Sequence, residues 1–255
     1  MDRNTLIGGS AVILIIVGIA LWAGLRPTPA KAPPPGTGAS AIANPYVERA
    51  AYYTIAANYP TTTPLLGDAS EEAVNAMQGF IIETISQFKT DGNFDKLTPE
   101  DIKMMGYDKG RQESLQITYL ISSSPRTVSY IFTVYADTLG AHPNAYFKTF
   151  TFDTKNGTQV TLNTLFASKS DYLGALSGIA RAKLPGIIGE EYADTDYIKS
   201  GTEPEEENFQ NFFIDNSVLD ILFSPYQVGP YAIGPQTLPI PLTELASILK
   251  NEYKP

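Results

Sequence analysis

The sequence predicts an α+β fold in which a mostly antiparallel sheet is covered by helices. Runs rich in β-branched and aromatic residues follow one another in adjacent pairs, turn-forming residues separate them, and helical periodicity is confined to a few segments. An α/β fold would need strands and helices to alternate regularly along the chain. Because the strand-like runs cluster instead, antiparallel hairpins are expected.

The first two elements of the folded part are a strand and a long helix. Residues 48–60, "ERAAYYTIAANYP", are rich in aromatic and β-branched residues and end at a proline, as an opening strand would. The stretch 68–93 begins with cap-type and acidic residues and stops at Asp91-Gly92, which predicts a helix. Its apolar positions at spacings of three and four predict one face packed on a sheet: Val74, Met77, Ile81, Ile85 and Phe88.

Two hairpins are predicted next. Residues 112–124 and 126–139 are dense in β-forming residues and form an expected antiparallel pair across "SSPR". In the following strand the Asn156-Gly157 pair supplies a turn with positive φ, after which Val160 resumes pairing. Alternation in that strand places Tyr146, Lys148, Phe150 and Phe152 on one face and Phe147, Thr149 and Thr151 on the other.

The C-terminal part is predicted to combine a helix with a small group of strands. Residues 161–188 read as a turn and then a helix carrying Leu173, Leu176 and Ile179, which Pro185-Gly186 breaks. The acidic "TEPEEEN", 202–208, is expected to be a solvated loop, because no Asp/Asn ladder at calcium-loop spacing accompanies its glutamates. The last segment predicts a strand, an Asp-Asn turn, a strand, a Pro/Gly/Tyr loop, a short strand and a final helix.

The N-terminal region predicts a membrane anchor. Residues 5–25 are 21 uncharged, mostly apolar residues, long enough to cross a bilayer. A cleaved signal peptide is the alternative, because "AKA" at 30–32 has a small-x-small form, but the apolar run is longer than usual for one. We expect a single-pass cell-membrane protein with a short cytoplasmic head at residues 1–4 and a Pro/Ala-rich disordered linker at 26–44. Two extracytoplasmic modules are expected to follow, an N-terminal one at 45–140 and a C-terminal one at 141–255.

The composition narrows the possible partners. A formal net charge of −9 and a pI near 4.7 argue against nucleic acid, which needs concentrated Lys and Arg, and favour a cationic partner. The chain contains no cysteine. This excludes disulfides, thiol nucleophiles and Cys-ligated zinc.

No motif for catalysis stands out. His142 is the chain's only histidine, and Asp137, Asp153 and many serines leave a triad open, but no G-x-S-x-G, Ser-x-x-Lys or His-Glu-x-x-His is present. A zinc-dependent deacetylase would lack its usual ligands. A glycosidase needs only two carboxylates, which are abundant here and therefore not diagnostic. We predict no catalysis, no cofactor and no metal.

Three stretches carry a family resemblance. "GAHPN", "FKTFTFDTKNGTQVTLNTLF" and "FFIDNSVLDILFSPYQVGPYAIGPQTLPIPLTEL" resemble the extracellular domain of lysozyme-binding anti-sigma factors, which is shared with the non-catalytic N-terminal portion of membrane-anchored peptidoglycan deacetylases. Together with "YTIAANYP" and the helix after it, the resemblance covers roughly residues 45–252. The chain departs from both groups, because a head of residues 1–4 cannot hold a sigma factor and no catalytic domain follows. The resemblance therefore implies the shared extracytoplasmic module on a tether.

These observations predict a bacterial cell-envelope binding or sensing module without catalysis of its own, whose ligand is lysozyme or a cell-wall component such as a peptidoglycan fragment. The alternative is a tethered cell-wall enzyme, a glycan or ester hydrolase using carboxylates or His142. We place binding on the loop 225–235, where three prolines and two glycines oppose regular pairing and rigid aromatic rings are available. Its candidate residues are Tyr226, Pro230 and Tyr231. For His142 we favour a structural role in its turn over a contact with the ligand.

Overall fold

The structure is a computed structural model that describes residues 44–255. The predicted membrane-spanning segment 5–25, the short head and the linker up to residue 43 lie outside these residues. Within the described part, no helix combines the length and the apolar character needed to cross a membrane.

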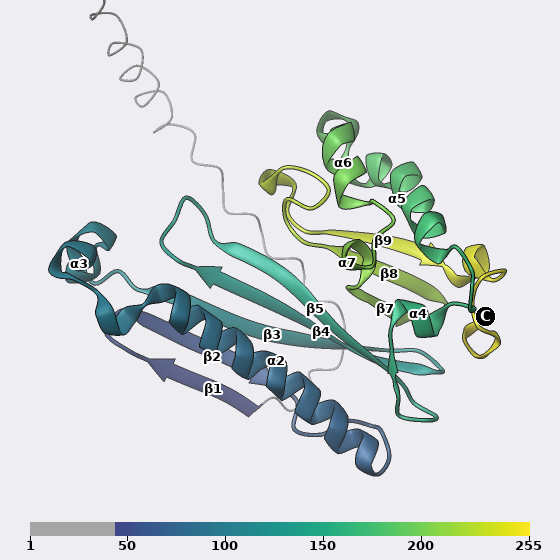
Figure 1. Cartoon of the computed structure of the whole chain (residues 1–255), viewed down its shortest axis with the longest axis horizontal. Coiled ribbons are helices and arrows are strands. Elements are labelled where there is room, and N and C mark those ends of the chain that lie inside the picture. The colour runs from purple at the N-terminus through teal and green to yellow at the C-terminus, as the bar shows by residue number, and fades with distance from the viewer. Residues whose placement is uncertain (1–43) are drawn as a thin grey trace, which may run out of the picture. The chain divides into compact units, whose positions relative to one another are not determined.

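Two sheets and a few helices confirm the α+β prediction (Figure 1). In the large sheet β2 and β3 are parallel and all other neighbours are antiparallel. Its strands, in spatial order, are β1 (Asn44–Arg49), β2 (Tyr53–Tyr59), β3 (Glu113–Ser123), β4 (Thr127–Asp137), β5 (Asn144–Asp153) and β6 (Gln159–Val160). The small antiparallel sheet has the order β7 (Phe212–Asp215), β8 (Val218–Phe223) and β9 (Gln236–Pro241).

Helix α2 (Asp68–Gly92) is the long helix that the sequence predicts, and it covers one face of the large sheet (Figure 1). It makes the crossover that the parallel pair β2 and β3 requires. Its buried residues are Ala73, Met77, Ile81 and Phe88, so the predicted stripe is the packed face, with Val74 and Ile85 only partly buried at its margins. The connection to β3 contains η1 (Phe94–Lys96), α3 (Pro99–Met105) and η2 (Tyr107–Lys109).

Both predicted hairpins form. Strand β3 pairs with β4, and β5 pairs with β6 across the turn that holds Asn156-Gly157. Strand β4 also pairs with β5, and the alternation in β5 is as expected. Phe150 and Phe152 belong to the core beneath α2. Thr149 and Thr151 point to the opposite face, where they hydrogen-bond to the backbone of Gln210 and of Phe212 in the small sheet.

The small sheet has its own core, built with α5 (Tyr172–Ile188). The prediction that Pro185 ends this helix is wrong: the helix continues to Ile188, because one missing N–H in the last turn costs less than exposing Leu184 and Ile188, both buried. The expected final helix is only the short turn η5. The remaining elements are α4 (Leu162–Leu165), η3 (Glu190–Tyr192), α6 (Thr195–Gly201), α7 (Glu206–Phe209), η4 (Tyr231–Ile233), η5 (Leu242–Leu245) and η6 (Asn251–Tyr253).

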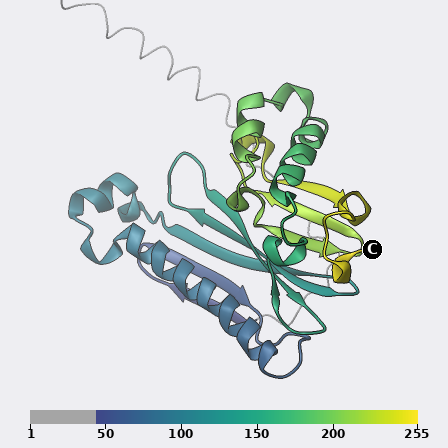
Figure 2. The same ribbon diagram turned by 45° about the vertical axis from the view of Figure 1, so that its right-hand side comes forward.

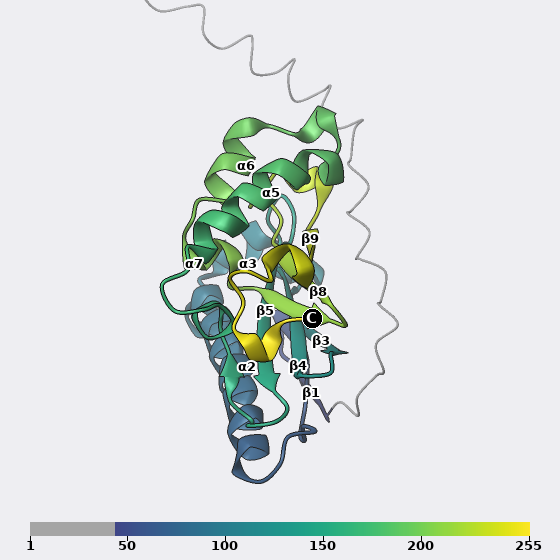
Figure 3. The same cartoon turned by 90° about the vertical axis from the view of Figure 1, so that its right-hand side faces the viewer.

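The small sheet packs on the large one (Figures 2 and 3). It does so through the edge of β7, which contacts β3, β4 and β5. An edge strand presents unpaired N–H and C=O groups. Hydroxyls on the face of the large sheet bond to three of these groups. The Thr149 hydroxyl accepts from the Phe212 N–H at 3.1 Å, and Thr151 and Ser122 donate to the Phe212 and Ile214 carbonyls at 3.3 Å. From the sequence, β5 is expected in a C-terminal module that begins at residue 141. In the structure β5 belongs to the large sheet, and the boundary between the two sheets lies near residue 160.

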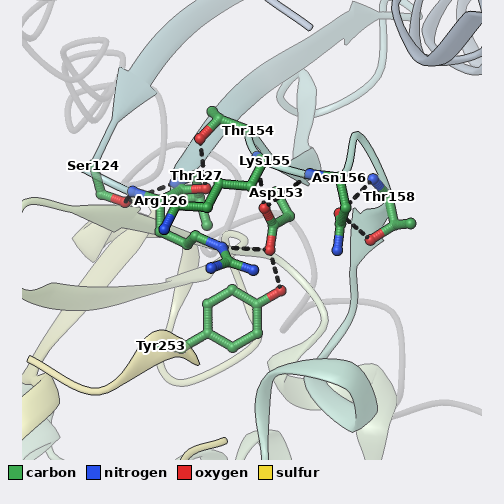
Figure 4. Close-up of polar contacts among 9 residues, drawn as sticks. All are labelled: Ser124, Arg126, Thr127, Asp153, Thr154, Lys155, Asn156, Thr158 and Tyr253. Carbon is green, nitrogen blue, oxygen red and sulfur yellow. Dashed lines mark hydrogen bonds and ion pairs between the residues drawn. The ribbon is translucent and has the colours of Figure 1, made fainter. Parts of the chain in front are cut away.

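A buried carboxylate joins the end of the described chain to the turn after β5 (Figure 4). Asp153 is fully buried and accepts from Arg126 Nε at 2.6 Å, from the Tyr253 hydroxyl at 3.1 Å and from the Lys155 N–H at 2.8 Å. Burial alone would raise the pKa of Asp153, but the hydrogen bonds from Lys155, Arg126 and Tyr253 together hold it below its ordinary value.

A second carboxylate, Asp220 on β8, is shifted in the opposite direction. Its pKa is raised to about 6, mainly by burial and secondly by the charge of Asp215. The folded state therefore prefers the protonated form, and its stability falls as pH rises from about 4 to about 6. We expect Asp220→Asn to raise the free energy of unfolding by about 2 kcal/mol at pH 7.5 and hardly at all at pH 3.5. Urea unfolding at the two pH values checks this, with exposed Asp108→Asn as control; an equal gain at both would contradict it.

Candidate functional site

Two loops far apart in sequence bring three of the four predicted binding residues together. His142 comes from the loop after β4, and Tyr226 and Tyr231 come from the loop after β8 (Figures 1 and 2). The His142 ring stacks on the Tyr231 ring at 3.9 Å between centroids and 19° between planes. Its Nε2 lies 2.7 Å from the Tyr226 hydroxyl. We call His142, Tyr226 and Tyr231 the aromatic cluster.

The hydrogen bonds of His142 define its proton position. Nδ1 lies 3.1 Å from the carbonyl oxygen of Pro143, which can only accept, so Nδ1 carries the proton. Nε2 then accepts from the Tyr226 hydroxyl. Both ring nitrogens are engaged in holding the cluster, so the structural role predicted for His142 extends to positioning Tyr226.

The tyrosines differ in exposure and backbone geometry. Tyr226 is 47% exposed and has a φ of 71°, a left-handed conformation that a non-glycine residue adopts at a cost of about 1 kcal/mol. Tyr231 opens the turn η4, and Pro230, which precedes it in extended conformation, accepts at its carbonyl from the Ile233 N–H. Pro230 thus shapes the turn that presents Tyr231.

Gln227, which sequence reasoning missed, anchors the loop between the two tyrosines. Its side-chain amide donates to the Asn208 carbonyl at 3.0 Å and accepts from the Ser224 N–H at 3.2 Å. Beneath it, Gly201 lies so close that a Cβ there would stand 1.8 Å from the Gln227 carbonyl oxygen. A glutamine in a loop has no distinctive pattern, so only the fold reveals this role.

Strand β4 adds a further ring and a carboxylate beside the aromatic cluster. Burial is the main cause that raises the pKa of Tyr231, and the charges of Tyr226 and Asp137 raise it further. Burial is also the main cause that raises the pKa of Tyr135, which is 37% exposed, and the charges of Asp137 and Tyr231 add to it. The phenols therefore stay protonated at neutral pH and can donate hydrogen bonds, while Asp137 provides an acceptor.

The two aspartates considered for a triad are both occupied away from His142. Asp137 accepts from the Leu139 N–H at 2.9 Å, and Asp153 is paired with Arg126. The glutamates of the acidic stretch, Glu205 to Glu207, are exposed, and no three acidic or histidine residues in the range 44–255 converge as metal ligands. What the aromatic cluster offers is a set of positioned rings with hydrogen-bonding groups at their edges.

Part of the chain is similar to a described protein family and to proteins of known sequence. Residues 163–243 match the model of a family described as a protein of unknown function, DUF3298. Peptidoglycan-N-acetylmuramic acid deacetylase PdaC of Bacillus subtilis is 28% identical over 202 residues, which are 79% of this chain and 40% of that protein. Immunogenic protein MPT64 of Mycobacterium tuberculosis is 28% identical over 133 residues, 52% of this chain and 57% of that protein.

Two crystal structures share the fold. A DUF3298-family protein of Bacteroides fragilis has a TM-score of 0.55 and 17% identity, with 85% of this chain and 96% of that one covered. One of Pseudomonas aeruginosa has a TM-score of 0.57 and 12% identity, with 85% and 95% covered. The resemblance to lysozyme-binding anti-sigma factors stays a prediction. Residues 163–243, which match the DUF3298 model, include both tyrosines of the aromatic cluster, and the chain is distantly similar to the peptidoglycan deacetylase.

Proposed function

We propose that this protein is a cell-envelope binding module that holds peptidoglycan glycan at its aromatic cluster and does not turn it over. The observation that carries the proposal is the half-exposed Tyr226 ring, fixed by His142 next to the stacked Tyr231. The homology to a peptidoglycan deacetylase supports the ligand class.

The chemistry of the cluster suits a sugar. The C–H face of a pyranose ring packs on an aromatic ring, and ring hydroxyls find donors and acceptors at the phenols and at Asp137. Because the His142–Tyr226 hydrogen bond and Gln227 already hold the rings, little side-chain entropy is lost on binding. Anchoring through residues 5–25 and the linker 26–44 would keep the module outside the cell membrane, near the wall.

A cationic protein such as lysozyme is the second candidate ligand, and the charge of the chain supports it. The chain has a net charge of −9, and Asp137 is close enough to affect the pKa of two of the rings. Such carboxylates would speed the encounter with a cationic partner and make binding sensitive to salt. An enzyme using His142 is less favoured, because Nε2 contacts the Tyr226 phenol and not a nucleophile.

Tyr226→Ala is expected to weaken binding to purified peptidoglycan about tenfold, the effect of losing one aromatic contact. The melting temperature should change little, because the ring is half exposed. Co-sedimentation of the whole chain with peptidoglycan measures the affinity. Tyr46→Ala, a similarly exposed tyrosine on β1, is the matched control and should bind normally.

The other outcomes separate the candidates. Salt-sensitive binding to lysozyme without binding to peptidoglycan would replace the glycan by the cationic protein. Release of soluble product from peptidoglycan by the wild type would overturn the non-catalytic proposal. Equal binding by Tyr226→Ala and the wild type would move the site away from the aromatic cluster.

A further inference from the structure

A groove on the other side of the β4–β5 hairpin has a chemistry of its own. Its volume is about 770 Å³, and it lies between the end of α2, the helix α3 and the ends of β3, β4 and β5; Figure 2 shows α3 at this end of the large sheet. Its acidic lining residues are Asp91, Asp101 and Glu113, and none of its lining residues is basic.

Glu113 is the least expected of these residues. It is 5% exposed and lines the groove, and its Oε1 accepts from the Tyr107 hydroxyl at 2.5 Å. Within residues 44–255 this phenol is the only hydrogen-bond partner of the carboxylate, and the second oxygen is not sealed off from solvent. A buried carboxylate normally has a cationic partner or several donors, because losing its hydration is costly.

Arg111, whose charge acts on Tyr107, does not supply that partner. Arg111 is exposed, and its guanidinium donates to the Met105 carbonyl at 3.3 Å. Its charge affects the pKa of Tyr107, but burial and Glu113 outweigh it and raise that pKa. Tyr107 therefore stays protonated and donates a hydrogen bond to Glu113, whose carboxylate lines the groove.

The rest of the groove favours a cation in the same place. The last residues of the 25-residue helix α2, Gly92 and the Asn93 that follows, line it, and the carbonyl end of a helix carries partial negative charge. Asp91 and Asp101 accept only from uncharged groups, Gln87 and Thr98. The walls are apolar and adaptable, with Phe88, Leu97, Met104, Met105, Leu115 and Val134.

We propose that this groove binds a primary ammonium group on an aliphatic stem, with the ammonium against Glu113 and the stem along the apolar wall. The site is separate from the aromatic cluster, and the proposal stands whether or not that cluster binds glycan. Two sources share this chemistry: the lysine-like side chain of a peptide, and a free alkyl diamine.

The four methionines of the chain allow a local readout with an internal control. Met104 and Met105 line the groove, whereas Met77 is fully buried on the packed face of α2. The whole chain, labelled at its methionine methyl groups, is titrated with Nα-acetyl-lysine amide, with cadaverine and with the uncharged Nα-acetyl-norleucine amide. We expect saturable shifts of the Met104 and Met105 signals with the two amines, an unmoved Met77 signal, and at least tenfold weaker binding of the norleucine compound.

Variants test the role of Glu113. Glu113→Gln keeps the shape and the Tyr107 contact but removes the charge, and should weaken amine binding at least tenfold. Exposed Asp91→Asn should weaken it severalfold without affecting folding, so the test holds even if the buried variant unfolds. Glu100→Gln, exposed on α3 and outside the groove, should bind normally.

Tighter binding of the lysine derivative would identify a peptide side chain as the source, and tighter binding of cadaverine a free diamine. Equal affinity for lysine and norleucine derivatives, absence of saturable shifts, or unchanged binding in both acidic variants would overturn the proposal.

Discussion

Replacing Asp153 with alanine is expected to lower the free energy of unfolding by about 3–5 kcal/mol, the usual cost of breaking a buried ion pair. The substitution removes the carboxylate that Arg126 and Tyr253 share. It also removes the acceptor of the Lys155 N–H in the turn after β5. Urea unfolding followed by circular dichroism measures the loss.

The pH dependence of this effect has a definite sign. Because the folded-state pKa of Asp153 is lowered, its stabilisation is present at neutral pH and is lost as pH falls below about 4. The difference between the wild type and Asp153→Ala should therefore shrink in acid. Glu244→Ala, which breaks the exposed pair with Lys183, should cost less than about 1 kcal/mol. Similar losses for the two variants would show that Asp153 is not a central anchor.

Gly157→Ala is expected to destabilise the protein by about 2 kcal/mol or more, a large effect for one methyl group. Gly157 has a φ of +74°, and a Cβ there would stand 2.3 Å from the Cβ of Ala69 at the start of α2. The variant combines left-handed strain with a clash, and replacing the whole pair Asn156-Gly157 with Val-Val should be worse.

The matched control is another glycine. Gly79 lies inside α2 and has open space around it, so Gly79→Ala should stabilise by about 0.5–1 kcal/mol. Alanine at Glu205, Glu206 and Glu207, all exposed, should change stability little. Thermal unfolding of the variants gives the order directly. A Gly157→Ala protein as stable as the wild type would contradict the close approach of this turn to α2.

Local patterns were sufficient for most of the fold. The stripe of α2 and the alternation of β5 are set by burial on one side of an element, which leaves a clear period in the sequence. Pro185 was misjudged because helix-breaking tendency is local, whereas Leu184 and Ile188 are held by a core formed later in the chain. The contact of β7 with Thr149 and Thr151 leaves no periodicity, since small polar residues are equally common at solvent-exposed positions.

The site was predictable only where composition was unusual. The loop 225–235 stands out by its prolines, glycines and tyrosines, and His142 stands out because it is the only histidine in the sequence. Their direct contact depends on the packing of the two sheets. The groove at Glu113 was not predicted, because its walls come from residues between 84 and 146 and Glu113 is one glutamate among many until burial distinguishes it.

The hydroxyl-capped edge of β7 also affects solubility. A bare strand edge is a template on which another chain can add a strand, and this is a common route to aggregation. In the small sheet that route is hindered on both sides. At β7 the Phe212 N–H and the Phe212 and Ile214 carbonyls are bonded to Thr149, Thr151 and Ser122. At β9 Pro239 and Pro241 lack the N–H that pairing needs. This sheet is therefore a poor template for strand exchange between neighbouring copies of the domain that carries the exposed Tyr226.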